Sequence, residues 1–480
     1  MRTMTLPQLA TSLFIASLWV MAQNSPAPLP PLPDARQLRW HSDAMNAFIH
    51  FGPNTFTGVE WGSGQEKAEA FNPTKLDARQ WVKAFKSAGF AGVVITAKHH
   101  DGFCLWPTAQ SKHSVASSTW KQGKGDVLKE LADACREAGL RFGVYLSPWD
   151  RNHPTYGTDA YNDTFVAMLE EVLTRYGSVF EVWFDGACGE GPNGKRQVYD
   201  WKRYVATVRK HAPDAVIFSD AGPDIRWVGN ERGHAAETSW CLLDRDRFVP
   251  GTDLAAELTE GHMNGTHWVP SECDVSIRPG WFWRASETQK VKSGMALLDL
   301  YERSVGWNAN FLLNVPPNVD GLIDDADVAA LDDFGRRVRH TYQKNLIEGA
   351  LCVASSSFGD GTAHPAARLT DGDSSTYWAA ASDAKSASIV VVAKAPLTFD
   401  RIRLVEPIAL GQRTRSFTIE AKSATGWEVL GTGTTIGASR IVRTKPTTAS
   451  EIRVTITESK GTVLLASISA HRSPPLILPR

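Results

Sequence analysis

The chain has 480 residues, of which 42% are hydrophobic and 21% are charged, as in ordinary globular proteins. At about 150 residues per domain, this length predicts roughly three units, although a barrel of 250 residues or more could form one of them. The 51 Lys and Arg residues balance 52 Asp and Glu residues, for a formal net charge of −1. A chain without excess positive charge lacks the electrostatic footprint of nucleic-acid-binding proteins. We therefore expect no nucleic-acid partner. The 17 tryptophans suit sugar-stacking surfaces and a large core equally well.

The N-terminal residues have the pattern of an export signal. Arg2 precedes a short apolar run, Leu9–Ala22, with Val20 and Ala22 at the positions expected for cleavage. This predicts a secretory signal peptide over residues 1–22, with an uncleaved membrane anchor as the alternative. A Pro-rich stretch over residues 23–35 is predicted to be an extended leader. We therefore expect the protein to be periplasmic or extracellular, with no later segment crossing a membrane.

Six cysteines are scattered along the chain without a CxxC pattern or metal-ligand spacing. They are Cys104, Cys135, Cys188, Cys241, Cys273 and Cys352. An oxidising compartment permits disulfides, but a large core does not need them. Buried free thiols are the expected state, and disulfide pairing is the alternative.

Residues 36–345 alternate apolar strand-like runs with helical patterns. The predicted strands are 45–51, 92–98, 140–146, 180–185, 215–219 and 311–315, and the predicted helices are 77–88, 126–138, 163–176, 201–211 and 295–305. Strands that are apolar throughout indicate a parallel sheet covered on both faces. No phosphate-binding glycine pattern follows the first strand, so a (β/α)₈ barrel is favoured over a doubly wound sheet. After residue 219 the remaining strands are hard to place.

The composition changes near residue 345. Residues 350–480 are rich in Ser, Thr, Val and Ala, with short alternating runs at 387–392, 402–405, 416–421 and 451–456. This pattern predicts a β-sandwich. Residues 366–378 (AARLTDGDSSTYW) resemble the early segment of discoidin-type (F5/8 type C) domains. That resemblance implies a sugar-binding module, and a purely structural domain is the alternative.

Polar side chains follow successive predicted strands. His50, the pair His99 and His100, Tyr145 and Asp185 each stand where a strand ends. In a barrel these ends share one side, where active sites lie. Adjacent histidines on a strand point to opposite faces and rarely bind one ion unless the strand has already ended, so we expect hydrogen bonds to a polar ligand rather than a metal site. A carboxylate such as Asp185 after an apolar run is costly unless it is paired or functional.

Six segments resemble glycoside hydrolase family 29, the retaining α-L-fucosidases. They are AFIHFG at 47–52, VEW at 59–61, AKHHDGF at 97–103, GVYLS at 143–147, EVWFDGA at 181–187 and NFLLNVPP at 310–317. Two further segments, 186–196 (GACGEGPNGKR) and 272–283 (ECDVSIRPGWFW), resemble the branch that prefers α-1,3- and α-1,4-linked fucose on branched glycans.

The resemblance implies an exo-acting retaining α-L-fucosidase that acts on fucosylated oligosaccharides or glycoproteins. We expect no cofactor and no metal, because the histidines are interpreted as hydrogen-bond partners of hydroxyl groups rather than as ligands. The resemblance places the nucleophile on Asp185. Its sugar-binding residues fall on His50, Glu60, Trp61, His99, His100, Tyr145 and Trp183. A mixture of polar and aromatic side chains suits fucose, which carries three hydroxyl groups and a methyl group.

The acid/base of a retaining glycosidase is a second carboxyl group. Glu231, in RWVGNERG, resembles the acid/base of the α-1,3/1,4 branch, and Glu237 and Glu272 are its rivals. Three other functions stay open: a non-catalytic fucose-binding protein, a fucosidase with broad or α-1,2 specificity, and a metal-dependent hydrolase that uses the histidines. The sequence does not indicate an oligomeric state.

Overall fold

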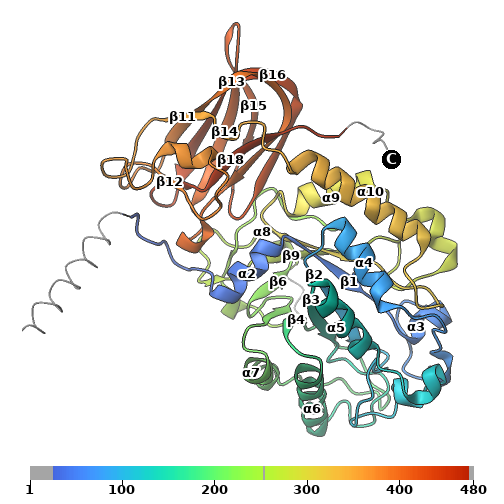
Figure 1. The fold of residues 1–480 in the computed structure, drawn as a ribbon. Helices are drawn as coiled ribbons and strands as arrows, with labels where there is room; N and C mark the ends of the chain where they lie inside the picture. Colours follow the sequence, from blue (N-terminus) through green and yellow to red (C-terminus); the bar gives the residue numbers. More distant parts are fainter. Residues whose placement is uncertain (1–24, 252–254, 475–480) are drawn as a thin grey trace, which may run out of the picture. The chain divides into compact units, whose positions relative to one another are not determined.

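The computed structural model describes residues 25–251 and 255–474, which form two compact units (Figure 1). One unit covers Pro33–Gln343, and the other covers Lys344–Ser473 together with residues 25–32. The predicted signal peptide, residues 1–22, lies outside the described residues. No helix in the described part of the chain is long and apolar enough to cross a bilayer.

The first unit is built on a closed barrel whose strands, within the described residues, number eight and all run parallel. In order around the barrel they are β1 (Met45–Ile49), β10 (Asn310–Asn314), β9 (Ser271–Ser276), β6 (Ile225–Trp227), β5 (Val216–Ser219), β4 (Val179–Trp183), β3 (Arg141–Leu146) and β2 (Gly92–Lys98). The barrel closes where β1 pairs with β10, with Met45 opposite Phe311. The predicted (β/α)₈-type architecture is confirmed.

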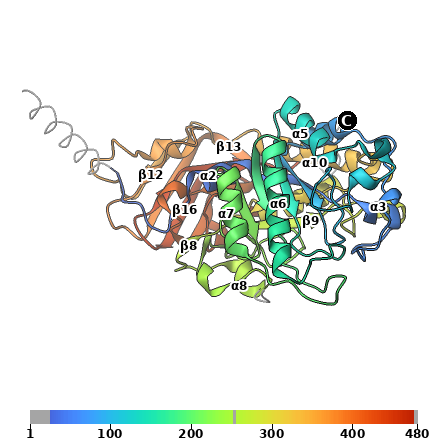
Figure 2. The same cartoon turned by 90° about the horizontal axis from the view of Figure 1, so that it is seen from below.

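Helices surround this barrel (Figure 1). They are α2 (Ala35–Asp43), α3 (Pro53–Thr57), α4 (Ala78–Ala88), α5 (Val127–Ala138), α6 (Asp159–Arg175), α7 (Trp201–His211), α8 (Ala255–Glu260), α9 (Gly294–Ser304) and α10 (Asp325–Tyr342). The predicted boundaries of α4 follow from its caps, because Asp77 accepts hydrogen bonds from the first turn and Gly89 has φ of +96°. The helix α6 starts four residues before its predicted start, and it packs beside α7 (Figure 2).

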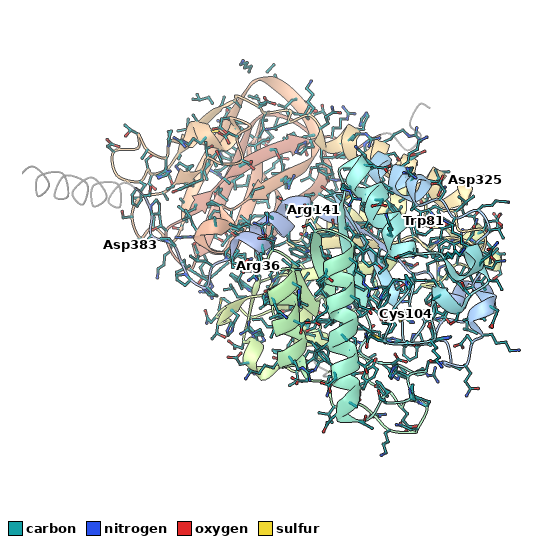
Figure 3. All side chains as sticks on the ribbon, turned by 60° about the horizontal axis from the view of Figure 1, so that its bottom comes forward. Arg36, Trp81, Cys104, Arg141, Asp325 and Asp383 are labelled. Atoms are coloured by element: carbon teal, nitrogen blue, oxygen red, sulfur yellow. The ribbon has the colours of Figure 1, made fainter. Side chains whose placement is uncertain are left out.

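Trp81 shows how these helices are fixed to the barrel. The side chain is buried on α4 (Figure 3), and its indole N–H donates to the backbone oxygen of Gly321 at 2.9 Å. Burying a large aromatic side chain contributes much of the packing energy, and the hydrogen bond satisfies its one polar atom.

The barrel departs from strict strand–helix alternation between β5 and β6. Five residues, 220–224, join these two parallel strands, so no helix separates them. Both β6 and β9 escape prediction from sequence. The first has only three residues. The second, SECDVS, alternates polar and apolar side chains although all of them are buried, because the barrel interior is polar there.

The second unit is an antiparallel β-sheet domain. Its main sheet has the order β11 (Leu351–Ala354), β13 (Ala387–Val405), β16 (Arg440–Ser459), β14 (Thr414–Ser423) and β15 (Gly426–Gly433), and β18 (Ser467–His471) pairs with β13. A small second sheet joins β12 (Trp378–Ala379) and β17 (Leu464–Leu465). The predicted runs 387–392 and 402–405 belong to one strand, β13. Its pairing slips between Val392 and Leu397, where Pro396 has no N–H to offer the ladder.

Residues 25–32 of the predicted leader pack on this second unit. The backbone N–H of Leu29 donates to Leu410 O at 2.9 Å, and Arg413 Nη2 donates to Ala27 O at 2.7 Å. These contacts fix the segment to the sheet domain instead of leaving it as a free spacer.

All six cysteines lie within the described residues, and all are free thiols. Four are buried, whereas Cys188 and Cys352 are partly exposed.

Candidate active site

A cavity of about 190 Å³ lies where the barrel strands end. Seven of the eight side chains predicted at strand ends or implied for sugar binding line it, together with the predicted acid/base. Its lining residues are Phe48, His50, Trp61, His99, His100, Tyr145, Trp183, Asp185, Ala187, Glu231, Asp274 and Trp281. Because these residues come from six different strands or the loops after them, only the closed barrel brings them together.

Asp185 is held at the wall of this cavity by two hydrogen bonds, and a third residue, His100, lies beside it. Tyr145 Oη donates to Asp185 Oδ2 at 3.0 Å, and the backbone N–H of Ala187 donates to Oδ1 at 2.8 Å. His100 Nε2 lies 3.7 Å from Oδ2. Burial and the charge of Asp185 raise the pKa of Tyr145 well above its usual range. The phenol therefore stays protonated and continues to donate to the carboxylate.

Two of the histidines are neutral and present an unprotonated nitrogen. Burial lowers the pKa of His50 to about 3 and that of His100 to about 4. His50 Nδ1 is 3.0 Å from Asn314 Oδ1, an oxygen, so we assign the proton to Nδ1. His100 Nδ1 is 2.8 Å from Ser147 Oγ, whose own hydroxyl donates to Trp149 O. In both rings Nε2 is left as an acceptor for a hydroxyl group.

His99 and His100 both line the cavity, because they follow the end of the strand and do not alternate between its two faces. The strand β2 ends at Lys98, and strand alternation no longer applies to the two residues that follow. Their rings lie side by side, with centroids 4.2 Å apart. Among the described residues, no group of three His, Cys, Asp or Glu side chains could hold a metal ion.

Glu231 lies at the solvent side of the cavity. Its carboxylate accepts from Trp281 Nε1 at 3.3 Å. Partial burial raises the pKa of this carboxyl group, and the negative charges of Asp185 and Glu60 act in the same direction. A carboxyl group that keeps its proton to higher pH is what a general acid requires.

Glu60 and the two rivals of Glu231 are not among the cavity's described lining residues. Glu60 Oε1 accepts from the backbone N–H of Trp281 at 2.5 Å, and Oε2 accepts from Arg284. The carboxylate thus fixes the loop that carries Trp281, and a direct contact with the sugar stays a prediction. Glu237 is exposed and Glu272 is fully buried inside the barrel.

A second cavity, of about 550 Å³, adjoins the first. It is lined by Trp183, Asp185, Gly186, Ala187, Cys188, Arg196, Gln197, Tyr199, Asp220, Trp227, Glu231, Pro250, Gly251 and Asp274. Sequence reasoning missed two of its carboxyl groups, Asp220 and Asp274. Asp220 directly follows β5, so the same strand-end pattern could have found it. Asp274 lies within β9, where no pattern marks it.

The sequence model of the family described as alpha-L-fucosidase matches residues 36–341. The chain belongs to this family. The model of the F5/8 type C domain matches residues 352–468, so the catalytic barrel of the fucosidase is followed by such a domain.

Similar proteins and similar solved structures support this family membership. The fucosidase is 45% identical to Alpha-L-fucosidase 1 of Arabidopsis thaliana over 423 residues, which cover 87% of this chain and 83% of the relative. It superposes on the crystal structure of SpGH29 with a TM-score of 0.89 at 38% identity, covering 94% of this chain and 100% of the other. The structure of a Ruminococcus gnavus GH29 fucosidase in complex with fucose superposes with a TM-score of 0.87 at 34% identity. The match covers 94% of this chain and 96% of the other. This protein is thus a glycoside hydrolase that releases fucose from fucose-containing substrates.

Beneath the smaller cavity of the fucosidase lies a pair of buried carboxyl groups, Glu181 and Glu272. Glu181, Trp183 and Asp185 are two residues apart along β4 and its continuation, so all three face the barrel interior at successive depths. Glu272 Oε2 accepts from Trp183 Nε1 at 3.1 Å. Burial raises the pKa of both carboxyl groups, to about 7 for Glu181, although the positive charge of Arg141 (Figure 3) lowers it somewhat.

This pair is expected to make the fucosidase less stable as pH rises. In the unfolded chain Glu181 ionises near its ordinary pKa of 4.5, whereas the folded protein keeps its proton to about pH 7. Between these values the folded state binds the extra proton, so the free energy of unfolding falls with increasing pH, by on the order of 2 kcal/mol. Urea unfolding of wild type and Glu181→Gln at pH 5 and pH 8 measures the difference.

The Gln variant should lose less stability between the two pH values than the wild type, because it has no proton to release. Glu69→Gln, which changes an exposed carboxylate, serves as the control and should follow the wild type. The same pH dependence in the wild type and in Glu181→Gln would contradict the assignment.

Proposed function

We propose that the enzyme is an exo-acting retaining α-L-fucosidase that removes α-1,3- or α-1,4-linked fucose from branched glycans by double displacement. Asp185 is the nucleophile and Glu231 the acid/base. The observation that carries this proposal is the position of these two carboxyl groups. Both line the small polar and aromatic cavity and also the larger cavity beside it. The bond between fucose in the first cavity and its leaving sugar in the second would therefore lie between them.

In the first step an oxygen of Asp185 bonds to the anomeric carbon as the bond to the leaving oxygen breaks. Glu231 transfers its proton to that oxygen. In the second step Glu231 takes a proton from water, whose oxygen bonds to the anomeric carbon as the bond to Asp185 breaks. Two inversions give net retention of the α configuration.

The histidines and aromatic residues bind the sugar in this proposal. The Nε2 atoms of His50 and His100 accept hydrogen bonds from hydroxyl groups, because burial keeps both rings neutral. Trp183, stacked on Phe218 with ring centroids 3.8 Å apart, offers a rigid apolar face beside Asp185.

Preference for a branched glycan is supported by the size and lining of the second cavity. At about 550 Å³ it is much larger than the sugar pocket of about 190 Å³. The segment 186–196, which resembles the α-1,3/1,4 branch, contributes Gly186, Ala187, Cys188 and Arg196 to its wall. A leaving group with two sugars has room to bind there.

A linkage panel tests the proposed specificity. We expect branched oligosaccharides with α-1,3- or α-1,4-linked fucose to be cleaved with kcat/KM at least about 100-fold above that of α-1,2-linked isomers, which corresponds to roughly 3 kcal/mol of differential transition-state binding. Fucose release by the purified enzyme is measured by chromatography, with an aryl α-L-fucoside as the reference for intact chemistry. Equal rates on all linkages would reject the branch assignment and leave the fucosidase activity in place.

Export of the enzyme is a further proposal. It rests on the N-terminal sequence alone, in which residues 1–22 have the pattern of a cleaved signal peptide.

A further inference from the structure

Asp274 lies at the junction between the two cavities. Only five described residues line both: Trp183, Asp185, Ala187, Glu231 and Asp274. Two of these are the proposed catalytic carboxyl groups, so Asp274 is a third carboxyl group at the level of the bond to be cleaved. Double displacement requires only two. A function for Asp274 must therefore be sought outside the two catalytic roles.

The position of Asp274 follows from the register of β9. Glu272 and Asp274 are two residues apart, so their side chains face the barrel interior on the same side of the strand. Glu272 occupies the deeper layer, beneath Trp183, and Asp274 the layer that opens into the cavities. The side chain is thus fixed on a rigid strand instead of a loop, as precise recognition requires.

The surroundings of Asp274 favour its neutral form. The residue is only 4% exposed. Burial raises the pKa of its carboxyl group well above the usual range, and the neighbouring carboxyl groups of Glu231 and Glu272 act in the same direction. Trp227 Nε1 donates to Oδ1 at 2.9 Å, which acts in the opposite direction and also orients the carboxyl plane. A protonated carboxyl group can donate one hydrogen bond and still accept others.

We propose that Asp274 is a substrate-binding residue whose protonated carboxyl group donates a hydrogen bond to an oxygen of the sugar to which fucose is attached. This inference rests on the proposed function, because it takes the second cavity to hold the leaving sugar. The bound oxygen is one that an oligosaccharide carries near the linkage and an aryl leaving group lacks. Asp274 therefore distinguishes natural substrates from aryl fucosides without taking part in proton transfer to the leaving oxygen.

The test compares Asp274→Leu, which removes the donor, with Asp274→Asn, which keeps an N–H donor in the same shape. Each is assayed on a fucosyl disaccharide and on an aryl α-L-fucoside. We expect Asp274→Leu to lose about 10- to 100-fold in kcat/KM on the disaccharide and less than about 3-fold on the aryl fucoside. Asp274→Asn should stay within about 5-fold of wild type on both. If Asp274→Leu does not fold, Asp274→Ala gives the same comparison.

A series of disaccharides that each lack one hydroxyl group of the leaving sugar identifies the partner. The wild type should cleave one of these deoxy disaccharides with kcat/KM about 10-fold below that for the parent disaccharide. The Asp274→Leu variant should cleave that deoxy disaccharide and the parent equally well. That coupling is specific to a direct contact, since a merely structural role would lower all members alike.

Equal losses on the disaccharide and the aryl fucoside would overturn the proposal, as would an Asp274→Leu variant with wild-type activity on both. A large loss in Asp274→Leu that azide rescues on the aryl fucoside would instead make Asp274 the acid/base. The rates of the wild-type enzyme on the linkage panel test the proposed function. The ratio of kcat/KM between the Asp274 variants and the wild type tests the role of Asp274. The two can therefore fail separately.

Discussion

Replacing Asp185 with alanine is expected to lower kcat by about 10⁴-fold or more on every α-L-fucoside, because both chemical steps of the proposed mechanism pass through this carboxylate. No other group can take its place without movement, since Tyr145 and Ala187 fix its two oxygens at 3.0 and 2.8 Å. Steady-state rates on an aryl fucoside and on a fucosylated oligosaccharide measure the loss. The expected fall is the same for both, because a leaving group cannot compensate for a missing nucleophile.

Two observations make this prediction specific. Asp185→Asn keeps the shape of the side chain and an oxygen for Tyr145 but has no nucleophilic oxygen, so it should fall as far as Asp185→Ala. Azide added to Asp185→Ala should attack an activated fucoside from the face that Asp185 occupied, and the product should be β-fucosyl azide. Activity within about 10-fold of wild type in either variant would show that the nucleophile lies elsewhere.

Replacing Glu231 with alanine is expected to separate substrates by their leaving groups. Loss of a general acid costs typically about 10²–10⁴-fold, so kcat/KM on a fucosylated oligosaccharide should fall by that amount. An aryl leaving group of low pKa needs little protonation, and kcat/KM for the aryl fucoside, which reports the first step, should change little. The second step of the proposed mechanism loses its base with both substrates, so kcat falls. With the aryl fucoside, whose first step stays fast, a fucosyl-enzyme accumulates. Rapid-quench mass measurement detects it as a covalent adduct.

Azide distinguishes a missing base from general damage. It needs no base, so it should restore turnover of the aryl fucoside by Glu231→Ala. It attacks opposite the β-linked fucosyl-enzyme, so the product should be α-fucosyl azide, the opposite anomer to that from Asp185→Ala. Glu237→Ala, a change at an exposed glutamate outside the described cavity walls, should stay within about 2-fold of wild type. Equal losses on both substrates without rescue would remove Glu231 from the role.

Two glutamates on or after neighbouring barrel strands show why sequence alone left rivals for the acid/base. Glu231 follows the short strand β6 on a loop, and its carboxylate reaches the cavity beside Trp281. Glu272 carries the same chemical group but lies one layer below the cavity, within hydrogen-bond distance of Trp183. Depth along a barrel strand depends on register with the neighbouring strands. For a three-residue strand and a strand with a polar interior face, no hydrophobic pattern fixes that register.

Local patterns determined the barrel and most of the residues that line the smaller cavity. Runs of apolar residues such as Gly92–Lys98, capped helices such as Ala78–Ala88 and polar residues at strand ends are all readable in the chain. Parallel strands in a closed barrel must bring those ends together, so the sequence alone groups His50, Tyr145 and Asp185.

Only the tertiary structure decided which nitrogen of each histidine is free, that His99 and His100 share one cavity, and that Asp274 stands between the two cavities. Each of these depends on partners distant in sequence: Asn314 for His50, Ser147 for His100 and Trp227 for Asp274. The physical reason is that burial and hydrogen bonding set the protonation of a side chain. Both are properties of the packed barrel and not of the segment that carries the residue.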